Sequence, residues 1–253
     1  MAVWTAPETT ASDRVAKAHR SRTGNAPAHT ADAPGTFIVV GENSDHFGGI
    51  TIVGLTDLRA AAAVSPREDS TIAVHAEFAG ITVEETTDCT RIAQLAEHNE
   101  PADESPARTL AERFGGLVHT LVGRQMLSRD TAGMDITVIA DIPLGAGLGA
   151  LHAADAALVL ALMGGDEEID AAPLRTRLAD IASQSARTFS DLPVLRARHS
   201  AALRGKEDTV SVIDYADGSL TQAPHPAKAE VRIVSVASSH GEPVSYTHLR
   251  AHE

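Results

Sequence analysis

Three glycines, Gly145, Gly147 and Gly149, alternate with other residues in a segment whose chemistry would suit a phosphate group. They follow an alternating apolar segment, Met134–Ala140, and precede an Ala/Leu-rich one. Alternate glycines allow backbone conformations closed to other residues and let a ligand approach the chain closely. A helix that begins directly after them directs free N–H groups and its positive dipole end into the same space. In isolation, such a segment is a plain packing turn more often than a phosphate site. The P-loop is excluded because no lysine follows, and the dinucleotide fingerprint lacks its context.

The spacing of apolar residues predicts the elements that would position this loop. Helices are expected over Ser12–Ser21, Arg108–Met126, the residues after the glycines up to about Met163, and Ala172–Arg187. Strands are expected over Thr36–Val40, Ile50–Val53, Arg59–Ser65, Thr71–Ala76, Met134–Ala140, Val210–Ile213 and Val231–Val236. The acidic stretch Glu84–Glu104 is expected to be loop and helix edge on a solvated face. Because strands and helices mix without a regular βαβ alternation, the sequence predicts the α+β class.

Composition narrows the choice of partners. The formal net charge is −13 at pH 7, and nucleic acid is not expected because nothing supplies a basic patch. A nucleotide is compatible with this charge, since backbone N–H groups can hold phosphates without lysines. Cys89 is the single cysteine, which excludes an intrachain disulfide and a thiolate metal cluster. No apolar run reaches membrane-spanning length and the first residues lack the pattern of a signal peptide, so a cytoplasmic protein without a membrane partner is expected.

Two motifs resemble the GHMP family of small-molecule kinases, and galactokinases in particular. Pro143–Leu148 (PLGAGL) resembles the second family signature, Pro-x-Gly-x-Gly-Leu followed by serines and alanines. Ala33–Gly49 (APGTFIVVGENSDHFGG) is similar to the first galactokinase signature, in which Ala-Pro-Gly-Arg leads to Gly-Glu-His-x-Asp-Tyr and a Gly-Gly pair. The order and spacing of the motifs are also like the family's, and the similarity covers about residues 28–240. The resemblance implies an N-terminal GHMP kinase domain, with a fold like that of domain 2 of ribosomal protein S5.

The resemblance also implies ligands. In galactokinases the first motif lines the sugar pocket, where ionised acidic residues accept strong hydrogen bonds from hydroxyl groups. This assigns substrate binding to Glu42, Asn43 and Asp45, with Asn43 in place of the family's histidine; ordinary loop carboxylates are the alternative. The triphosphate of ATP is implied at the loop residues Gly145, Ala146, Gly147, Leu148 and Gly149. Magnesium is implied together with ATP, but its ligands are not evident in the sequence.

Several positions depart from the family pattern at the places that serve phosphoryl transfer. Thr36 replaces an arginine that neutralises charge near the reacting phosphate, and a hydroxyl cannot replace a guanidinium there. The family's serines after Gly-Leu, which help hold magnesium and phosphate, read Gly149, Ala150 and Leu151 in this chain. These losses make ordinary turnover unexpected.

A third motif of the family, which carries a metal-binding Glu and the catalytic Asp, is matched by SARTFSDLPVLRARH. Anchored on Phe189 and Pro193, the alignment puts Ala186 at the Glu position and Arg198 at the Asp position. Asp191 is the nearest carboxylate, but it falls where the family has glycine. No catalytic residue is therefore matched.

The expected organisation is a polar segment over residues 1–30, a GHMP kinase N-terminal domain over 31–240 and a tail over 244–253. The tail does not continue the family pattern; it looks like translated adapter or vector sequence, with a native divergent tail as the alternative. The C-terminal GHMP domain is then expected to be mostly missing. Apolar surface left uncovered in this way is expected to promote self-association.

Three functions stay open at this point. The chain is a galactokinase-like sugar kinase, a non-catalytic regulator that binds sugar or nucleotide, or the product of a decayed gene without selected function. The retained sugar motif beside the lost phosphoryl-transfer chemistry favours the regulator for the chain as it stands.

Overall fold

A mixed sheet of seven strands forms the centre of the computed structural model, which describes residues 8–42, 44, 47–97 and 108–225. Six strands follow the order β4-β3-β5-β2-β6-β7, and β1 pairs with β2 beside this path. The pair of β3 and β5 is parallel, whereas all the other pairs are antiparallel. The strands are β1 (His29–Val40), β2 (Ile50–Arg67), β3 (Thr71–Phe78), β4 (Ile81–Asp88), β5 (Gly133–Ala140), β6 (Thr209–Asp214) and β7 (Leu220–Pro224).

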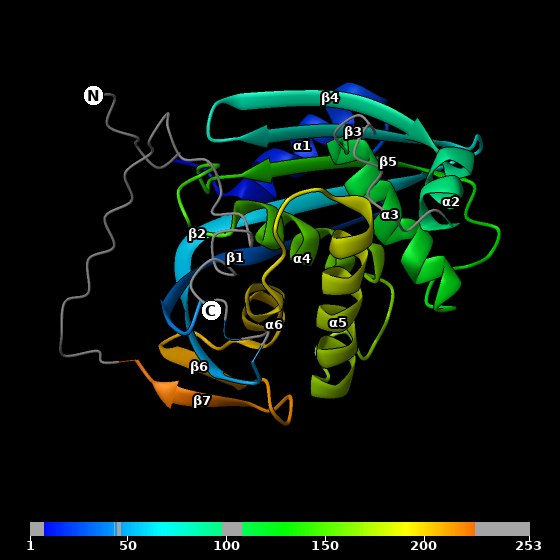
Figure 1. Cartoon of the computed structure of the whole chain (residues 1–253). Helices are drawn as coiled ribbons and strands as arrows, with labels where there is room; N and C mark the ends of the chain where they lie inside the picture. Colours follow the sequence, from blue (N-terminus) through cyan, green and yellow to red (C-terminus); the bar gives the residue numbers. More distant parts are fainter. Residues whose placement is uncertain (1–7, 43, 45–46, 98–107, 226–253) are drawn as a thin grey trace.

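Helices cover both faces of this sheet (Figure 1). They are α1 (Ala11–Thr23), α2 (Cys89–Glu97), α3 (Leu110–Gly123), α4 (Ala150–Leu162), α5 (Ala172–Phe189) and α6 (Arg196–Arg204). Successive residues of a strand point to opposite faces. Ala61 and Ala63 of β2 accordingly pack with Val15 of α1, whereas Ala60 and Ala62 belong to the main core with α3 and α4. The α+β class and the helices α1, α3, α4 and α5 agree with the expectation from the sequence.

Helix α4 is the most deeply placed helix of the core. All of its residues except Leu151 are buried, and it packs against β1, β2, α5 and α6. A helix that is apolar on every side is stable only when it is surrounded in this way. The Gly loop at its start is therefore attached to a deeply buried helix.

The two strands expected over Ile50–Val53 and Arg59–Ser65 form one continuous strand, β2, so their separation was wrong. Its first half pairs with β6 and its second half, from Ala60 to Arg67, pairs with β5, while β1 runs along both halves. The polar residues between the two halves suggested a break in the sequence. Pairing with β1 bridges that break.

The acidic stretch was also only partly predicted. Ile81–Asp88 forms strand β4, and loop was the wrong expectation for its acidic end, Glu84–Asp88. The strand lies at an edge of the sheet, and from Thr82 on its residues alternate between exposed and half-buried. An edge strand with one solvated face tolerates acidic side chains, and its threonines, valine and isoleucine favour strands. The following helix α2 buries Ile92 and Leu95.

Helix α6 and strand β7 were not predicted at all, and the strand expected over Val231–Val236 lies outside the described residues. Helix α6 has only 9 residues, and it buries three polar side chains, Arg198, His199 and Ser200. A short helix with polar residues on its buried face lacks the apolar periodicity by which helices are recognised. Within the described part of the chain, no helix has the length and apolar character needed to cross a membrane.

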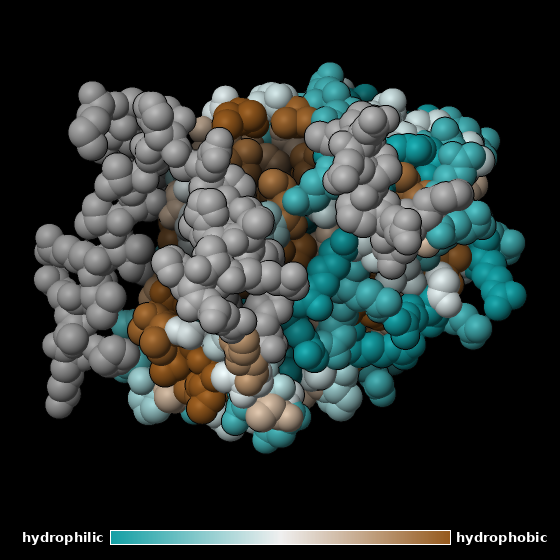
Figure 2. Space-filling model, viewed as in Figure 1, coloured by the Kyte–Doolittle hydropathy of each residue, from teal (hydrophilic) through white to brown (hydrophobic). Residues whose placement is uncertain are grey.

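A cluster of exposed apolar side chains lies where β1 ends and β2 begins. Val39, Val40, Phe47 and Ile50 are each more than half exposed, and Phe47 is 81% exposed. Figure 2 shows apolar surface at the lower left, over the corner where β1, β2 and β6 meet in Figure 1. Grouped apolar side chains of this kind favour association between proteins.

We expect this cluster to drive self-association of the purified chain. Replacing Phe47 and Val40 by serine should shift the chain from oligomer toward monomer, because water-exposed apolar area is removed without touching the core. The measurement is size-exclusion chromatography with light scattering. The matched control is Ile81→Ser, which removes an exposed apolar side chain from the far edge of the sheet. A monodisperse monomer of the unmodified chain would contradict the prediction.

Candidate active site

The two resemblance motifs meet in space at Thr36. Its backbone N–H, in strand β1, donates a hydrogen bond of 2.9 Å to the carbonyl of Leu148 in the Gly loop. Thr36 is 1% exposed and Leu148 is also buried. Residues more than a hundred positions apart in sequence are thus fixed against each other by a backbone hydrogen bond.

The Gly loop adopts the conformation that its glycines permit. The φ angles of Gly145, Gly147 and Gly149 are 74°, 72° and 67°, in the left-handed region that disfavours other residues. Nothing lies within 4 Å of a Cβ built on Gly145 or Gly147, so these two positions border open space. A Cβ on Gly149 would instead lie 2.7 Å from Thr36 Oγ1 and 3.1 Å from Arg198 Nη1. Gly149 is therefore required both by its backbone angle and by close packing.

Helix α4 begins directly after Gly149, which is its N-cap and makes no side-chain capping hydrogen bond. The first N–H groups of a helix have no partner within the helix and carry its positive dipole end. The residues predicted to hold the triphosphate, which are Gly145, Ala146, Gly147, Leu148 and Gly149, therefore form a loop with the geometry of an anion site. Their role in binding ATP stays a prediction.

Arg198 of helix α6 lies where the two motifs meet. Thr36, Leu148, Gly149 and Arg198 are together called the junction below. Arg198 Nη1 donates hydrogen bonds to the Thr36 carbonyl at 2.6 Å and to Thr36 Oγ1 at 3.2 Å. The residue is 6% exposed, and burial lowers its pKa while the charge of Glu42 acts in the opposite direction. Arg196, two residues earlier, points elsewhere and pairs with Asp180 at the surface. Sequence reasoning flagged Arg198 but not the helix that carries it.

The loop after β1 closes back onto the start of β2. Thr51 Oγ1 donates to the Gly41 carbonyl at 2.9 Å and bonds Ser44 Oγ at 2.8 Å. Gly41 has a φ of 86°, and a Cβ there would lie 2.1 Å from the Ile50 carbonyl. Of the residues predicted to bind sugar, Glu42 is exposed on this loop near Arg198, and Asn43 and Asp45 lie outside the described residues. Glu42 thus lies near Arg198, and sugar binding by all three residues stays a prediction.

Asp191 lies at a different place. It accepts a hydrogen bond of 2.5 Å from the Arg108 backbone N–H and is 3.8 Å from the Arg108 guanidinium. Its side chain is 57% exposed at the start of α3. These contacts give no support to Asp191 as a replacement for the missing base.

A buried polar network lies next to the junction, and sequence reasoning missed it. Asp155 of α4 accepts from Arg113 Nε at 3.0 Å and Nη2 at 2.5 Å, and bonds His199 Nε2 at 2.9 Å. His199 Nδ1 in turn bonds Ser183 Oγ at 3.0 Å, and its ring lies 4.8 Å from that of His152. The order Ser, His and Asp is that of a nucleophilic triad, but Ser183 is 3% exposed and His199 is 0% exposed. Both side chains are closed off from solvent, which indicates a structural role for the network.

The charge states in this network follow from burial and pairing. Burial acts to raise the pKa of Asp155, but Arg113 and the hydrogen bond from His199 outweigh it and hold that pKa well below its usual range. Burial lowers the pKa of His152 and of His199; neighbouring cations add to the effect at His152, whereas Asp155 opposes it at His199. Asp155 is thus ionised and the two histidines are neutral near pH 7.

These histidines should make the fold sensitive to mild acid. Their folded pKa lies below the ordinary value of 6.5, so the unfolded chain binds more protons once the pH falls below that value. The contribution of the neutral histidines to the free energy of unfolding is complete above about pH 6.5 and decreases as the pH falls. Urea unfolding between about pH 7.5 and pH 5 should show a decreasing midpoint, with a shallower decrease for His152→Gln. A midpoint that is constant or rises toward pH 5 would contradict this expectation.

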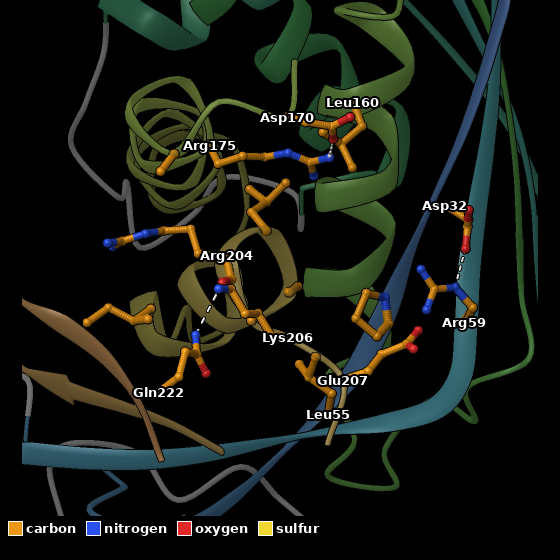
Figure 3. A pocket seen from close by; sticks show the side chains of 16 residues that line it. Asp32, Leu55, Arg59, Leu160, Asp170, Arg175, Arg204, Lys206, Glu207 and Gln222 are labelled. Carbon is orange, nitrogen blue, oxygen red and sulfur yellow. Dashed lines mark hydrogen bonds and ion pairs between the residues drawn. The ribbon is translucent and has the colours of Figure 1, made fainter. Parts of the chain in front are cut away.

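A cavity of about 560 Å³ lies at the opposite end of α4, beside Leu160 (Figure 3). Two ion pairs border it, Arg59 with Asp32 and Arg175 with Asp170, the latter at 2.6 Å. Gln222 donates to the carbonyl of Arg204 at 3.2 Å on another side. None of the Gly loop residues lines this cavity, so it is separate from the junction.

The residues of the junction do not fit a magnesium ion. Among the described residues, no three His, Cys, Asp or Glu side chains are grouped in a way that would hold a metal. Leu151 and Ala186, which occupy two positions where the resemblance implies metal ligation, have no side-chain oxygen. Magnesium requires oxygen ligands, whereas the charged side chain bonded to Thr36 is the cation Arg198.

Comparison with known proteins identifies the fold. No protein-family model matches the sequence. The structure is similar to Lactococcus lactis galactokinase complexed with galactose, with a TM-score of 0.63 and 14% identity over 84% of this chain and 51% of that chain. It is also similar to Methanococcus jannaschii mevalonate kinase, with a TM-score of 0.55 and 13% identity over 78% of this chain and 56% of that chain. For a D-glycero-D-manno-heptose 1-phosphate kinase from Bacteriodes thetaiotaomicron the TM-score is 0.50, with 17% identity over 77% and 59%.

The chain has the fold of the N-terminal part of GHMP-family kinases, as the resemblance implied. It spans between half and three fifths of the length of these solved structures.

Proposed function

We propose that this chain binds the triphosphate of ATP at the loop 145–149 and a sugar at the loop 41–49, without kinase turnover at an ordinary rate. The function is thus that of a ligand-binding regulator. The observation that carries the proposal is the contact of Arg198 with Thr36 directly beside Gly149.

Phosphoryl transfer to a sugar hydroxyl uses a group that takes up the proton and cations that neutralise the spreading charge. A guanidinium cannot take up a proton at any ordinary pH. Among the described residues, the ionisable side chain bonded at the junction is Arg198, and Asp191 is tied to Arg108. The left-handed glycines and the helix N-terminus after them support phosphate binding, whereas the described side chains at the junction lack a group that could take up the proton.

The experiment is isothermal titration of ATP and of galactose, together with a coupled kinase assay. Binding of ATP without turnover would support the proposal. Turnover within about a hundredfold of an ordinary kinase rate of 1–100 per second would contradict it.

A second candidate is an active galactokinase-like sugar kinase. It is favoured by the galactose-bound galactokinase among the similar structures and by the motif Ala33–Gly49. The assay just described distinguishes it from the regulator.

The sugar site is tested by comparing two substitutions. If a hexose binds, Asp45→Ala should weaken its binding more than Asn43→Ala does. A charge-assisted hydrogen bond contributes about 1.5–3 kcal/mol, against about 1 kcal/mol for a neutral one. Calorimetric dissociation constants provide the measurement. Equal effects of the two substitutions would place the hexose elsewhere.

A further inference from the structure

We infer that polyphosphate binding at the loop 145–149 does not depend on a divalent metal, because the guanidinium of Arg198 supplies the local positive charge. The inference rests on the proposed function, since it concerns the same loop.

Arg198 is buried without a carboxylate partner among the described residues. The residue is 6% exposed, and its hydrogen bonds to Thr36 go to a neutral carbonyl and a neutral hydroxyl. No carboxylate of the described part of the chain lies within ion-pair distance of it. Removing a charge from water is costly unless an opposite charge compensates it. An anion next to Arg198 would provide that compensation, and exposed Glu42 does so only from a distance.

Arg198 also lies close to the N-terminus of helix α4. Arg198 Nη1 lies 3.1 Å from the Cβ position of Gly149, the N-cap of α4. The full charge of the guanidinium therefore adds to the partial positive charge of the helix N-terminus. The two bonds to Thr36 hold the guanidinium in place, so little side-chain freedom is lost when a ligand binds.

The net charge of the protein also affects the binding of an anion. With a formal net charge of −13, the chain repels a free polyphosphate at long range. A bound magnesium ion would normally offset this repulsion, but the described residues offer no group of metal ligands. Arg198 is the fixed cation at the loop and can take over this neutralising role.

The test is calorimetric titration of ATP into the full chain, once with excess EDTA and once with excess magnesium. We expect dissociation constants that agree within about threefold, since the charge is provided by the protein. Arg198→Met should weaken ATP in EDTA by about ten- to a hundredfold, the range of a charge-assisted contact. Arg196→Met is the matched control: it removes a guanidinium of the same helix that pairs with Asp180, and should leave binding within about twofold.

Two outcomes separate the claims. Binding that is lost in EDTA and restored by magnesium overturns the inference and leaves the proposed function intact. Absence of ATP binding in both buffers overturns the proposed function and the inference with it. Thermal unfolding without ligand shows whether Arg198→Met is folded; if it is not, the comparison of EDTA and magnesium on the unmodified chain decides the question.

Discussion

Asp155→Ala is expected to lower the free energy of unfolding by about 3–5 kcal/mol, the range for breaking a buried ion pair on one side. Asp155 is 2% exposed and Arg113 is 3% exposed, so the substitution leaves a guanidinium uncompensated in the core. The same change removes the partner of His199 Nε2. The substitution therefore leaves unpaired groups on two helices, α3 and α6, that pack around α4.

Urea unfolding followed by circular dichroism measures this effect. The matched control is Asp180→Ala, which breaks the exposed pair with Arg196 and should cost less than about 1 kcal/mol. Replacing both partners, as in Asp155→Leu with Arg113→Met, should recover much of the lost stability because no charge is then left unpaired. An unfolding midpoint of Asp155→Ala equal to that of the control would show that the network does not stabilise the fold.

The Gly loop could be located from the sequence because its signals are local. The alternation of Met134–Ala140, the glycines and the apolar helix after them lie within one continuous segment, and each has a recognisable period or conformation. The structure confirms the strand and the helix on either side of the loop.

The rest of the candidate site depends on contacts between distant segments. Arg198 was aligned from the anchors Phe189 and Pro193, but its bond to Thr36 spans 162 positions and has no local signature. Asp155 stood in an Ala-rich segment as one polar residue of a helix, and its partners Arg113 and His199 come from two other helices. The continuity of β2 likewise follows from the strands that pair with it. Periodicity identifies elements, whereas these features follow from how the elements pack.

The contact between Thr36 and Arg198 leads to a prediction about both stability and activity, which concerns the substitutions Thr36→Arg and Arg198→Asp. Thr36→Arg alone would put a second guanidinium next to a buried one, and Arg198→Asp alone would put a carboxylate against the Thr36 carbonyl. Each single substitution is therefore expected to destabilise the fold. Together they place opposite charges side by side, so the double variant should be more stable than the sum of the single effects predicts, with a coupling of about 1–3 kcal/mol.

The double variant should nevertheless remain without measurable sugar phosphorylation. It restores a carboxylate and an arginine at positions that the family resemblance assigns to catalysis, but Gly149, Ala150 and Leu151 still provide no hydroxyl for magnesium and phosphate. Urea unfolding of the four proteins in the cycle gives the coupling, and the coupled kinase assay gives the turnover. Additive destabilisation would mean that the two introduced side chains do not share a site. Turnover within about a hundredfold of 1–100 per second would show that a base and one arginine suffice, and the requirement for the missing hydroxyls would then be wrong.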